Sequence, residues 1–384
     1  MSTPSSLHLD SGREFRGGQR QVLYLLQGLQ KRGHRVLLCC PRQSPLYERG
    51  AAAGIPVQPL TLRSGLDFAS SVRLVRLVRE GNFDLVHAHD AGSHSIALAA
   101  QGIGRHPALT DRLVVTRRSI GLAAGRLDRL KYDRAGTLYI AISNAVRDSL
   151  LRLGVAASRI LVVPSGIELR PPAARHDEDP WDFGARGLRV IGTVGHLTRE
   201  KNHALLLDAF ARVHRQIPGT HLLVAGDGPL HAALARRAAT LGVAPHVTFA
   251  GRVEDVGTVY AALSIFALSS DVEGLCTSLL DAMAVGVPCA VTAVGGVLEI
   301  ARHGESALVV PPRDADALAG AIVRLLQQPD LAARVVEGAR RVAERYSIDR
   351  MVDGTAAVYD RALGTAKDPR PTPAAPPAPG ARAR

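Results

Sequence analysis

Residues 265–283 read IFALSSDVEGLCTSLLDAM, and this stretch decides the fold. Its first four residues are apolar, which is typical of a short buried strand, and its last seven have the apolar spacing of a helix. The turn between them contains an acid and a glycine, Glu273 and Gly274. The free amides of the helix start belong to Leu275, Cys276, Thr277 and Ser278. Such amides bind anions, so the stretch predicts a strand, a turn and a helix with an anion site between them.

Strand–turn–helix units of this kind recur along the chain. Expected strands lie at residues 7–9, 35–40, 56–60, 85–88, 113–116, 138–142 and 160–163, and again at 189–194, 221–225, 247–250, 265–268, 289–292 and 307–310. Expected helices include residues 18–32, 68–79, 144–153, 202–217, 229–241 and 277–285. Alternating strands and helices indicate parallel sheets covered by helices, and 384 residues exceed the size of most single cores. We therefore predict an α/β protein with two Rossmann-like, doubly wound domains that face each other across a cleft.

The expected domain boundaries follow from shifts in composition. Residues 170–187 (RPPAARHDEDPWDFGARG) are rich in proline and charge and have no apolar period. We predict a first domain at residues 1–170, a linker at 171–187 and a second domain at 188–346. A further helix is expected at 347–364. The segment 365–384 is rich in proline, alanine and arginine, which favours disorder.

Composition and cysteine spacing indicate an ordinary globular chain, with 46% apolar and 21% charged residues. No stretch approaches eighteen uncharged apolar residues, so a membrane-spanning helix is not expected. The first residues do not have the pattern of a signal peptide. The four cysteines (Cys39, Cys40, Cys276 and Cys289) have no C-x-x-C spacing, which disfavours disulfides and a zinc site. We expect a cytoplasmic protein.

The net charge of +12 lies entirely in the first half of the chain. Residues 1–170 contain 24 Lys and Arg against 12 Asp and Glu, whereas the remainder contains 23 of each. This asymmetry indicates an anionic partner, either a phosphorylated acceptor or the inner face of the plasma membrane, or else a solvated arginine-rich surface. The segment with Arg73, Arg76 and Arg79 is weakly amphipathic and fits either lipid headgroups or an ordinary sheet-covering helix. Nucleic-acid binding is disfavoured, because aromatic residues make up only 4% of the chain.

Three other loops after expected strands are suited to a ligand. The loop after residue 194 begins at Gly195 and His196 and reaches Lys201 at a helix start, where a cation beside free amides suits a diphosphate. The turns with Gly226 and Gly228 and with Gly251, Arg252 and Val253 let backbone approach a base or a ribose. Each turn alone is also compatible with a plain loop. The dinucleotide fingerprint G-x-G-x-x-G is missing, because His231 stands where its third glycine belongs.

In order along the chain, these pieces resemble the retaining family-four glycosyltransferases, which have the two-Rossmann GT-B fold. The matching pieces are Gly195-x-Leu197-x3-Lys201, Gly226-Asp227-Gly228-Pro229, Glu273-Gly274-Leu275 with Asp281 eight residues after the glutamate, and Gly286-Val287-Pro288 followed by Gly295-Gly296-x2-Glu299-Ile300. The similarity covers residues 17–363. It implies transfer of a sugar from a nucleoside diphosphate sugar to an acceptor hydroxyl, without a cofactor or bound metal. The acceptor that it implies is an anionic glycan or glycolipid of cell-envelope synthesis, either lipopolysaccharide or a lipid-linked glycan.

The resemblance also implies roles for single residues. Lys201 holds the donor diphosphate, Glu273 meets the donor sugar and Asp281 holds the ribose. Two positions depart from the family pattern: the arginine of G-R-L is His196, and the second glutamate is Asp281, which is shorter by one methylene. His196 can still donate a hydrogen bond.

The first half resembles the family less closely. Gly17 and Gly18 match its N-terminal glycine loop, which lies near donor phosphate and acceptor, and residues 84–90 (DLVHAHD) match its D-x-V-H-x-H strand end. We place His89 of that strand end in the active site, with a buried strand residue as the alternative for His87. Arg118 stands where the family often has the histidine of T-x-H. Lys201, Glu273, His89 and Arg118 are the candidate catalytic residues.

Two other functions remain open at this point. One is a sugar-nucleotide epimerase of similar fold. The other is a donor-binding protein without catalysis, which the changes at His196 and Asp281 suggest.

Overall fold

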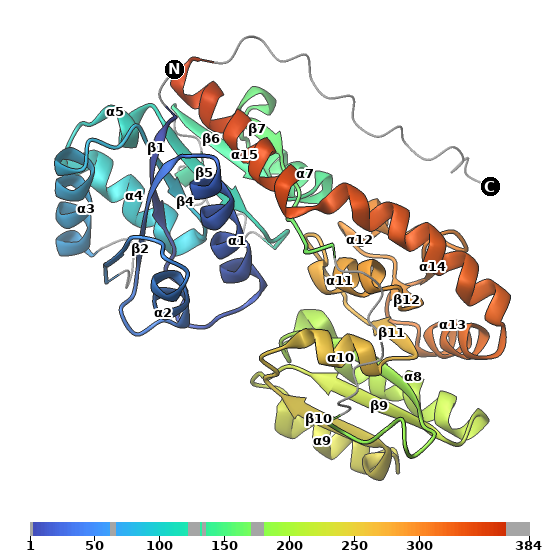
Figure 1. Ribbon diagram of the computed structural model, residues 1–384. Coiled ribbons are helices and arrows are strands. Elements are labelled where there is room, and N and C mark those ends of the chain that lie inside the picture. Colours follow the sequence, from blue (N-terminus) through green and yellow to red (C-terminus); the bar gives the residue numbers. More distant parts are fainter. Residues whose placement is uncertain (1–2, 62–66, 122–130, 133–135, 170–179, 366–384) are drawn as a thin grey trace.

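The computed structural model describes residues 3–61, 67–121, 131–132, 136–169 and 180–365, and has two lobes, each built around a sheet (Figure 1). The predicted tail, apart from Thr365, and the linker up to residue 179 lie outside the described residues. The end of the predicted linker packs on the second lobe, because Phe183 is buried there and stacks on Trp181.

The first lobe contains a seven-stranded parallel sheet in the order β3-β2-β1-β4-β5-β6-β7. Its strands are β1 (Ser5–Leu9), β2 (Arg35–Cys40), β3 (Val57–Pro59), β4 (Leu85–Ala88), β5 (Leu113–Arg117), β6 (Thr137–Ala141) and β7 (Ile160–Val162). Helices α1 (Gly17–Lys31), α2 (Pro45–Ala52), α3 (Phe68–Glu80), α4 (Ala91–Ile103), α5 (Pro107–Thr110) and α7 (Asn144–Arg152) connect them. β1 begins two residues before the predicted strand, since Ser5 donates from its amide and hydroxyl to Asp84 Oδ2 at 2.8 and 2.7 Å.

The second lobe repeats this plan with six parallel strands in the order β10-β9-β8-β11-β12-β13. The strands are β8 (Arg189–Val194), β9 (Thr220–Ala225), β10 (Val247–Gly251), β11 (Ile265–Leu268), β12 (Cys289–Thr292) and β13 (Leu308–Val310). Its helices are α8 (His203–Gln216), α9 (His231–Thr240), α10 (Val256–Ala262), α11 (Thr277–Val285), α12 (Val297–Ile300), α13 (Ala315–Gln327) and α14 (Pro329–Ala343). Two parallel, doubly wound sheets confirm the predicted fold class.

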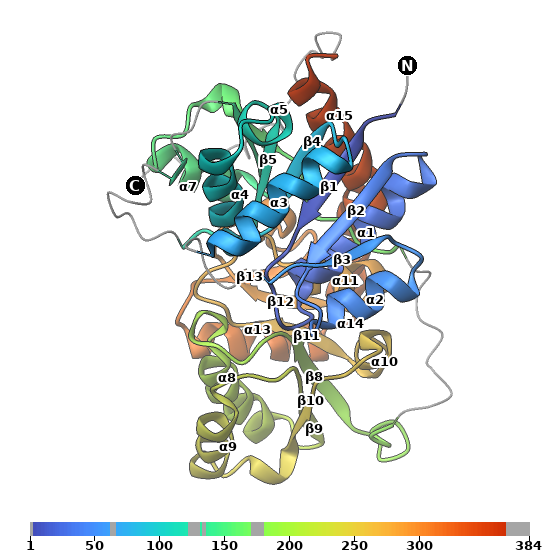
Figure 2. The ribbon, with the colours of Figure 1, turned by 90° about the vertical axis from the view of Figure 1, so that its left-hand side faces the viewer.

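The last described helix, α15 (Ile348–Leu363), returns to the first lobe (Figures 1 and 2). It packs against α1, where a Cβ on Gly28 would lie 2.4 Å from Val352, and Tyr359 on it is fully buried. The segment that leaves the first lobe and the segment that returns to it lie side by side. The amide of Ile167 donates to the carbonyl of Tyr346 at 2.8 Å, and its carbonyl accepts from the amide of Ile348 at 3.2 Å. Within the described part of the chain, no helix is long and apolar enough to cross a membrane.

Each sheet reverses its winding between two central strands, β1 and β4 in the first and β8 and β11 in the second. In open α/β sheets, ligands bind outside the carboxyl ends of the strands at this reversal. The loops after these four strands contain most of the residues that the sequence singled out.

Candidate functional site

The loops after β8 and β11 bring two of the predicted residues into contact. Lys201 lies in the 3₁₀ turn η2 (Arg199–Lys201), and its Nζ is 2.6 Å from Glu273 Oε1. The same carboxylate oxygen accepts from the hydroxyl of Ser270 at 2.7 Å. Burial alone would lower the pKa of Lys201, but the Glu273 carboxylate outweighs it and the pKa is raised. The ammonium is therefore charged at neutral pH beside the start of α11.

Glycine lets the turn before α11 pack closely against the first lobe. A Cβ on Gly274 would lie 2.1 Å from the carbonyl oxygen of Arg118, so only glycine fits there. A Cβ on Gly296 would in turn lie 2.0 Å from the carbonyl of Gly274. Leu275 and Cys276 are buried behind the turn, and Thr277 and Ser278 open the helix.

Cys276 is the cysteine of this turn, and its chemistry is inert. Burial and the neighbouring Glu273 raise the pKa of its thiol to about 12. A thiol with this pKa stays protonated at neutral pH, whereas the thiolate is the reactive form. Cys276 is therefore not suited to act as a nucleophile.

Asp281 lies one turn further along α11 and forms an ion pair with the first lobe. Its Oδ2 is 2.6 Å from Nη2 of Arg20 on α1. Only 22% of the Arg20 side chain and 15% of the Asp281 side chain are exposed. The sequence singled out Asp281 but not Arg20, since the two are 261 positions apart.

The β8 loop is held in shape by neighbouring glycine turns. A Cβ on Gly226 would lie 1.9 Å from the carbonyl of Gly195, and one on Gly228 would lie 2.7 Å from the amide of Leu197. A Cβ on Gly195 would in turn be 4.0 Å from the Lys201 side chain. These glycines let the loop pack closely around the lysine.

The outer part of this site faces the loop after β1. The pKa of Glu14 is lowered by a hydrogen bond from Arg16 and by the charges of His196 and Arg252. His196 and Arg252 therefore lie near the first lobe. Val253 follows Arg252 and packs against the cluster around Phe183.

The first lobe contributes its glycine loop and Arg118. A Cβ on Gly17 would lie 3.6 Å from Thr277 Oγ1, and one on Gly18 would lie 3.5 Å from Cδ of Arg118. Burial lowers the pKa of Arg118 to about 10, and the carboxylates of Asp10 and Asp90 oppose that shift. These two acids were not singled out as site residues from the sequence, although Asp10 directly follows β1 and Asp90 caps the start of α4 just after β4.

His89 lies deeper, in a cluster of three buried histidines. His8 Nδ1 is 3.0 Å from His89 Nε2, and His87 pairs with Thr116 and Tyr359, both at 2.7 Å. Burial, together with nearby positive groups, lowers the pKa of His87 and of His89 well below its usual value, so both imidazoles are neutral. His87 is the buried strand residue that the sequence allowed, and the proposed role of His89 in catalysis stays a prediction.

One ring nitrogen from each of these three histidines lies within 4.8 Å of the other two, which is the spacing of a metal site. Five of the six ring nitrogens already have hydrogen-bond partners, including Ser6 on His8 Nε2. His89 Nδ1 is buried without a partner among the described residues. The cluster is therefore described best as a hydrogen-bonded part of the core.

A second contact between the lobes involves Glu299 of the Gly-Gly motif. Its carboxylate accepts from the amide and side chain of Asn144 at 3.0 and 2.9 Å and from the amide of Ala145 at 2.9 Å. It thus caps the N-terminus of α7 across the lobe boundary. The motif signalled that this glutamate matters, but its partner could not be read from the sequence.

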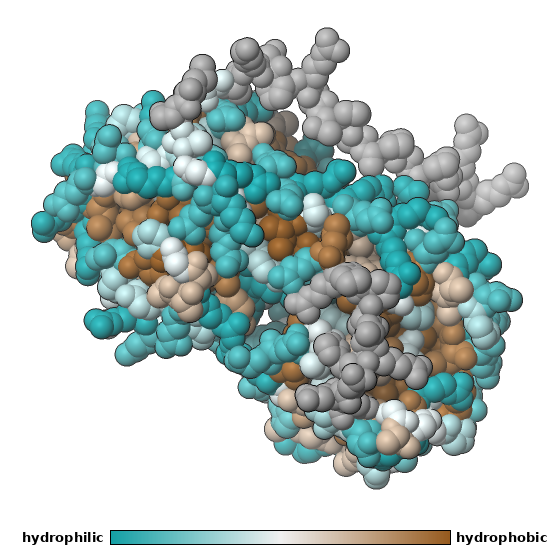
Figure 3. Space-filling view, viewed as in Figure 1, coloured by the Kyte–Doolittle hydropathy of each residue, from teal (hydrophilic) through white to brown (hydrophobic). Residues whose placement is uncertain are grey.

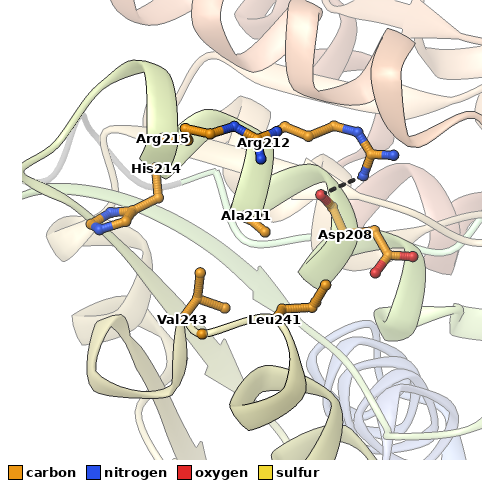
Figure 4. A pocket seen from close by; sticks show the side chains of 8 residues that line it. Asp208, Ala211, Arg212, His214, Arg215, Leu241 and Val243 are labelled. Atoms are coloured by element: carbon orange, nitrogen blue, oxygen red, sulfur yellow. Dashed lines mark hydrogen bonds between the residues drawn. The ribbon is translucent and has the colours of Figure 1, made fainter.

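A surface hollow of about 450 Å³ lies elsewhere, between α8 and the turn after α9 (Figure 4). In it Arg212 donates to the carbonyl of Asp208 at 2.8 Å. None of the predicted site residues lines this hollow.

Comparison with known proteins gives two family matches in chain order. Residues 15–170 match "Glycosyltransferase Family 4", and residues 177–342 match "Glycosyl transferases group 1". The boundary between the two matches falls in the segment predicted to link the domains.

Similar proteins span nearly the whole chain. The phosphatidyl-myo-inositol mannosyltransferase of Mycobacterium tuberculosis is 26% identical over 366 residues, covering 91% of this chain and 94% of that protein. The N-acetyl-alpha-D-glucosaminyl L-malate synthase of Bacillus anthracis is 25% identical over 301 residues, covering 76% and 78%. The structure of Anabaena HepE in complex with UDP and glucose superposes with a TM-score of 0.83 at 20% identity, covering 93% of this chain and all of that one.

The two sheets, the site at their reversal points and the two ordered family matches agree with one another. The chain belongs to the family-four glycosyltransferases of the GT-B fold and is a glycosyltransferase enzyme.

Proposed function

We propose that the enzyme transfers a sugar from a nucleoside diphosphate sugar to an acceptor hydroxyl with retention of anomeric configuration. The observation that carries the proposal is the contact of Lys201 with Glu273 beside the free amides of α11. In this contact a cation and a carboxylate lie together next to a helix start, where free amides favour anions. A diphosphate bonded to a sugar requires this combination.

Each group then has a distinct task. Lys201 and the α11 amides neutralise the charge that grows on the leaving diphosphate, Glu273 binds hydroxyls of the donor sugar, and Asp281 binds the ribose. When the donor binds, the ion pair between Lys201 and Glu273 must weaken. Lys201 can then contact the diphosphate, and the Glu273 carboxylate can accept hydrogen bonds from the sugar. Because the lysine supplies the positive charge, the reaction needs no bound metal.

UDP-glucose-type donors are the first candidates. HepE, whose fold this chain shares, is known in complex with UDP and with UDP-glucose. His196 and Arg252 lie in the loops after β8 and β10 and supply further hydrogen-bond donors for the base or the ribose.

The acceptor is an anionic molecule of the cell envelope, and the enzyme works as a peripheral protein on the cytoplasmic face of the membrane. Two relatives have anionic groups in their names, phosphatidyl-myo-inositol and L-malate. On α3, Phe68 and Val72 are exposed on the same side as Arg76, since they lie four residues apart. Apolar and basic side chains on one helix face suit anionic headgroups. On the face seen in Figure 3, hydrophilic residues surround apolar bands on both lobes.

Nucleotide binding and product analysis test this function. UDP, GDP and ADP, each alone and as its sugar conjugate, are added in turn and the shift in Tm is measured. The nucleotide sugar that stabilises most is then incubated with and without total envelope lipid. Acceptor-dependent transfer is the expected result. An altered nucleotide sugar without acceptor would instead indicate an epimerase, and binding without turnover would indicate a non-catalytic protein.

Chelation tests the metal independence. We expect transfer to survive excess EDTA, because Lys201 and the helix amides carry the charge of the diphosphate. Loss of activity that magnesium or manganese restores would contradict this part of the proposal.

A further inference from the structure

The two lobes meet at the starts of two helices, α1 of the first lobe and α11 of the second. Gly17, the first residue of α1, faces Thr277, the first residue of α11, with 3.6 Å between a Cβ on the glycine and Thr277 Oγ1. Arg20 follows Gly17 by three residues and Asp281 follows Thr277 by four, so each lies on the same helix face as its glycine or threonine. The ion pair between Arg20 and Asp281 therefore lies directly behind the contact of the two helix starts.

Among the described residues, this ion pair differs from the other one that bridges the lobes. Arg20 and Asp281 are both largely shielded from water, whereas in the pair of Arg49 and Glu254, 3.1 Å apart, the Glu254 side chain is 80% exposed. Nε of Arg20 is also buried and has no hydrogen-bond partner among the described residues. Shielded charges interact strongly, and removing one leaves the other without compensation. Arg20 thus contributes a shielded charge contact that holds the Asp281 carboxylate in position.

Arg20 is also badly placed for the stability of its own helix. It lies in the first turns of α1, where the helix dipole favours acids over bases, and its compensation comes from Asp281 in the other lobe. Asp281 has one methylene less than a glutamate, so its carboxylate stays closer to α11 and reaches less far towards a ligand. A shorter acid that must meet a ribose depends more on being held in one orientation.

We propose that Arg20 is a positioning residue for the donor: it orients the Asp281 carboxylate for the ribose hydroxyls, so that both domains build the nucleotide site. This inference rests on the proposed function, in which Asp281 binds the ribose. It adds that an arginine of the acceptor-side domain determines how tightly the donor is bound. Donor binding then favours contact between α1 and α11, because both helices act on the same carboxylate.

The test compares nucleotides that differ only in a ribose hydroxyl. Isothermal titration is carried out with UDP, 2′-deoxy-UDP and 3′-deoxy-UDP, or with the guanosine series if GDP binds more tightly. The variants are Arg20→Met, which keeps the aliphatic length without the charge, Arg20→Lys and Asp281→Asn. Arg49→Met serves as the matched control, because it removes an ion pair between the same domains at a distance from Asp281.

We expect Arg20→Met to weaken UDP binding by about tenfold or more, the range of a lost charge-assisted interaction. We also expect it to reduce the preference for UDP over at least one deoxy form. Asp281→Asn should reduce the same preference, and the double variant should lose little more than either single one. Arg20→Lys should retain part of the preference, and Arg49→Met should leave it unchanged.

Three outcomes contradict proposals at different levels. If Arg20→Met weakens UDP and its deoxy forms equally, Arg20 only tethers the domains. If it changes neither affinity, Arg20 has no role in donor binding, and the proposed function still stands on the wild-type titration. If the wild-type protein binds none of the nucleotides, the proposed function fails and this role fails with it.

Discussion

The two domains have the same strand order around their reversal points but different chemistry at them. In the second domain the carboxyl ends of β8 and β11 present Lys201 and Glu273, paired at 2.6 Å beside a helix start. In the first domain the ends of β1, β4 and β5 present the buried Asp10 and the half-buried Asp90 near Arg118, above a layer of neutral histidines. The scaffold is thus shared, and the side chains after each strand decide what the domain binds.

The net charge follows the same division. Residues 1–170 contain the whole excess of +12, whereas the rest of the chain is neutral by charge count. In the proposed function, a donor diphosphate is bound locally by one lysine and helix amides. The proposed anionic acceptor is attracted by a field that extends over the whole first domain. The comparison therefore predicts local, severe effects in the second domain and distributed, salt-dependent ones in the first.

The largest effects are expected at the pair in the second domain. We expect Lys201→Ala and Glu273→Gln each to lower kcat by about 10²–10³, the range for losing one preorganised charge-stabilising group. Steady-state kinetics with the identified donor measure the loss, and circular dichroism checks the fold. Arg212→Ala is the control, since it removes an exposed ion pair with Asp316 on the same domain. Wild-type turnover in both site variants would remove them from the mechanism.

Arg118 tests the acceptor side at a single residue. Reversal to Glu should lower kcat/KM for the acceptor by about 10–100-fold, because it places a third acid beside Asp10 and Asp90. Arg118→His introduces the residue that the family often has here and should retain more activity than the reversal. Arg105→Glu, an exposed reversal in the same domain, should leave the kinetics unchanged. Equal activity of all three variants would mean that Arg118 does not face the acceptor.

A smaller, several-fold effect is expected from salt. Interactions of exposed charges are screened over about 8 Å at physiological ionic strength, so acceptor KM should rise with salt while donor KM changes less. Reversing Arg73, Arg76 and Arg79 to Glu should weaken binding to vesicles of anionic lipid, measured by sedimentation. The control reverses Arg334, Arg341 and Arg345 on the second domain, which changes the net charge equally. Similar losses in both triple variants would show a general charge effect without a docking face on α3.

The smallest effect concerns stability against pH. Burial and the nearby Asp90 raise the pKa of Asp10 to about 6, above the usual value of about 4. The folded protein therefore holds this proton more tightly, and the stability due to Asp10 falls as pH rises from about 4 to 6, by at most about 1.4 kcal/mol per pH unit. Asp10→Asn should flatten that fall in urea titrations. Asp84→Asn is a control of opposite sign. Burial would raise the pKa of Asp84, but the hydrogen bonds from Ser5 outweigh it and the pKa is lowered. This variant should therefore lose stability above pH 4. A slope that Asp10→Asn leaves unchanged would mean that this carboxyl titrates normally.

Much of this architecture could be predicted from the sequence, because it depends on local patterns. The helix predicted at 277–285 is α11, and every predicted strand lies within two residues of an observed one. The strand, turn and helix around β11 and α11 were readable because they follow one another in the chain, and the anion site predicted there stays a prediction. Ser5 and Ser6 were missed as strand residues, since polar side chains give no apolar signal and their burial depends on Asp84 and His8.

The missed parts of the site are contacts between distant segments. Arg20 meets Asp281, and Glu299 meets the start of α7, across 261 and 155 positions. Neither pairing produces a recognisable sequence pattern, because each charged partner alone looks like an ordinary charged residue on a helix. The burial of His89 could not be predicted either, because it depends on packing against His8 of the neighbouring strand β1.

The return of α15 to the first domain has a consequence for how the protein is made. The second domain is in effect an insertion between β7 and α15, and the core beneath α1 includes Met351, Val352, Val358 and Tyr359 from that last helix. During synthesis the first domain emerges first, yet these four side chains reach the ribosome exit only after the whole second domain. The first domain must therefore wait, with part of its core uncovered, until the second domain has been translated.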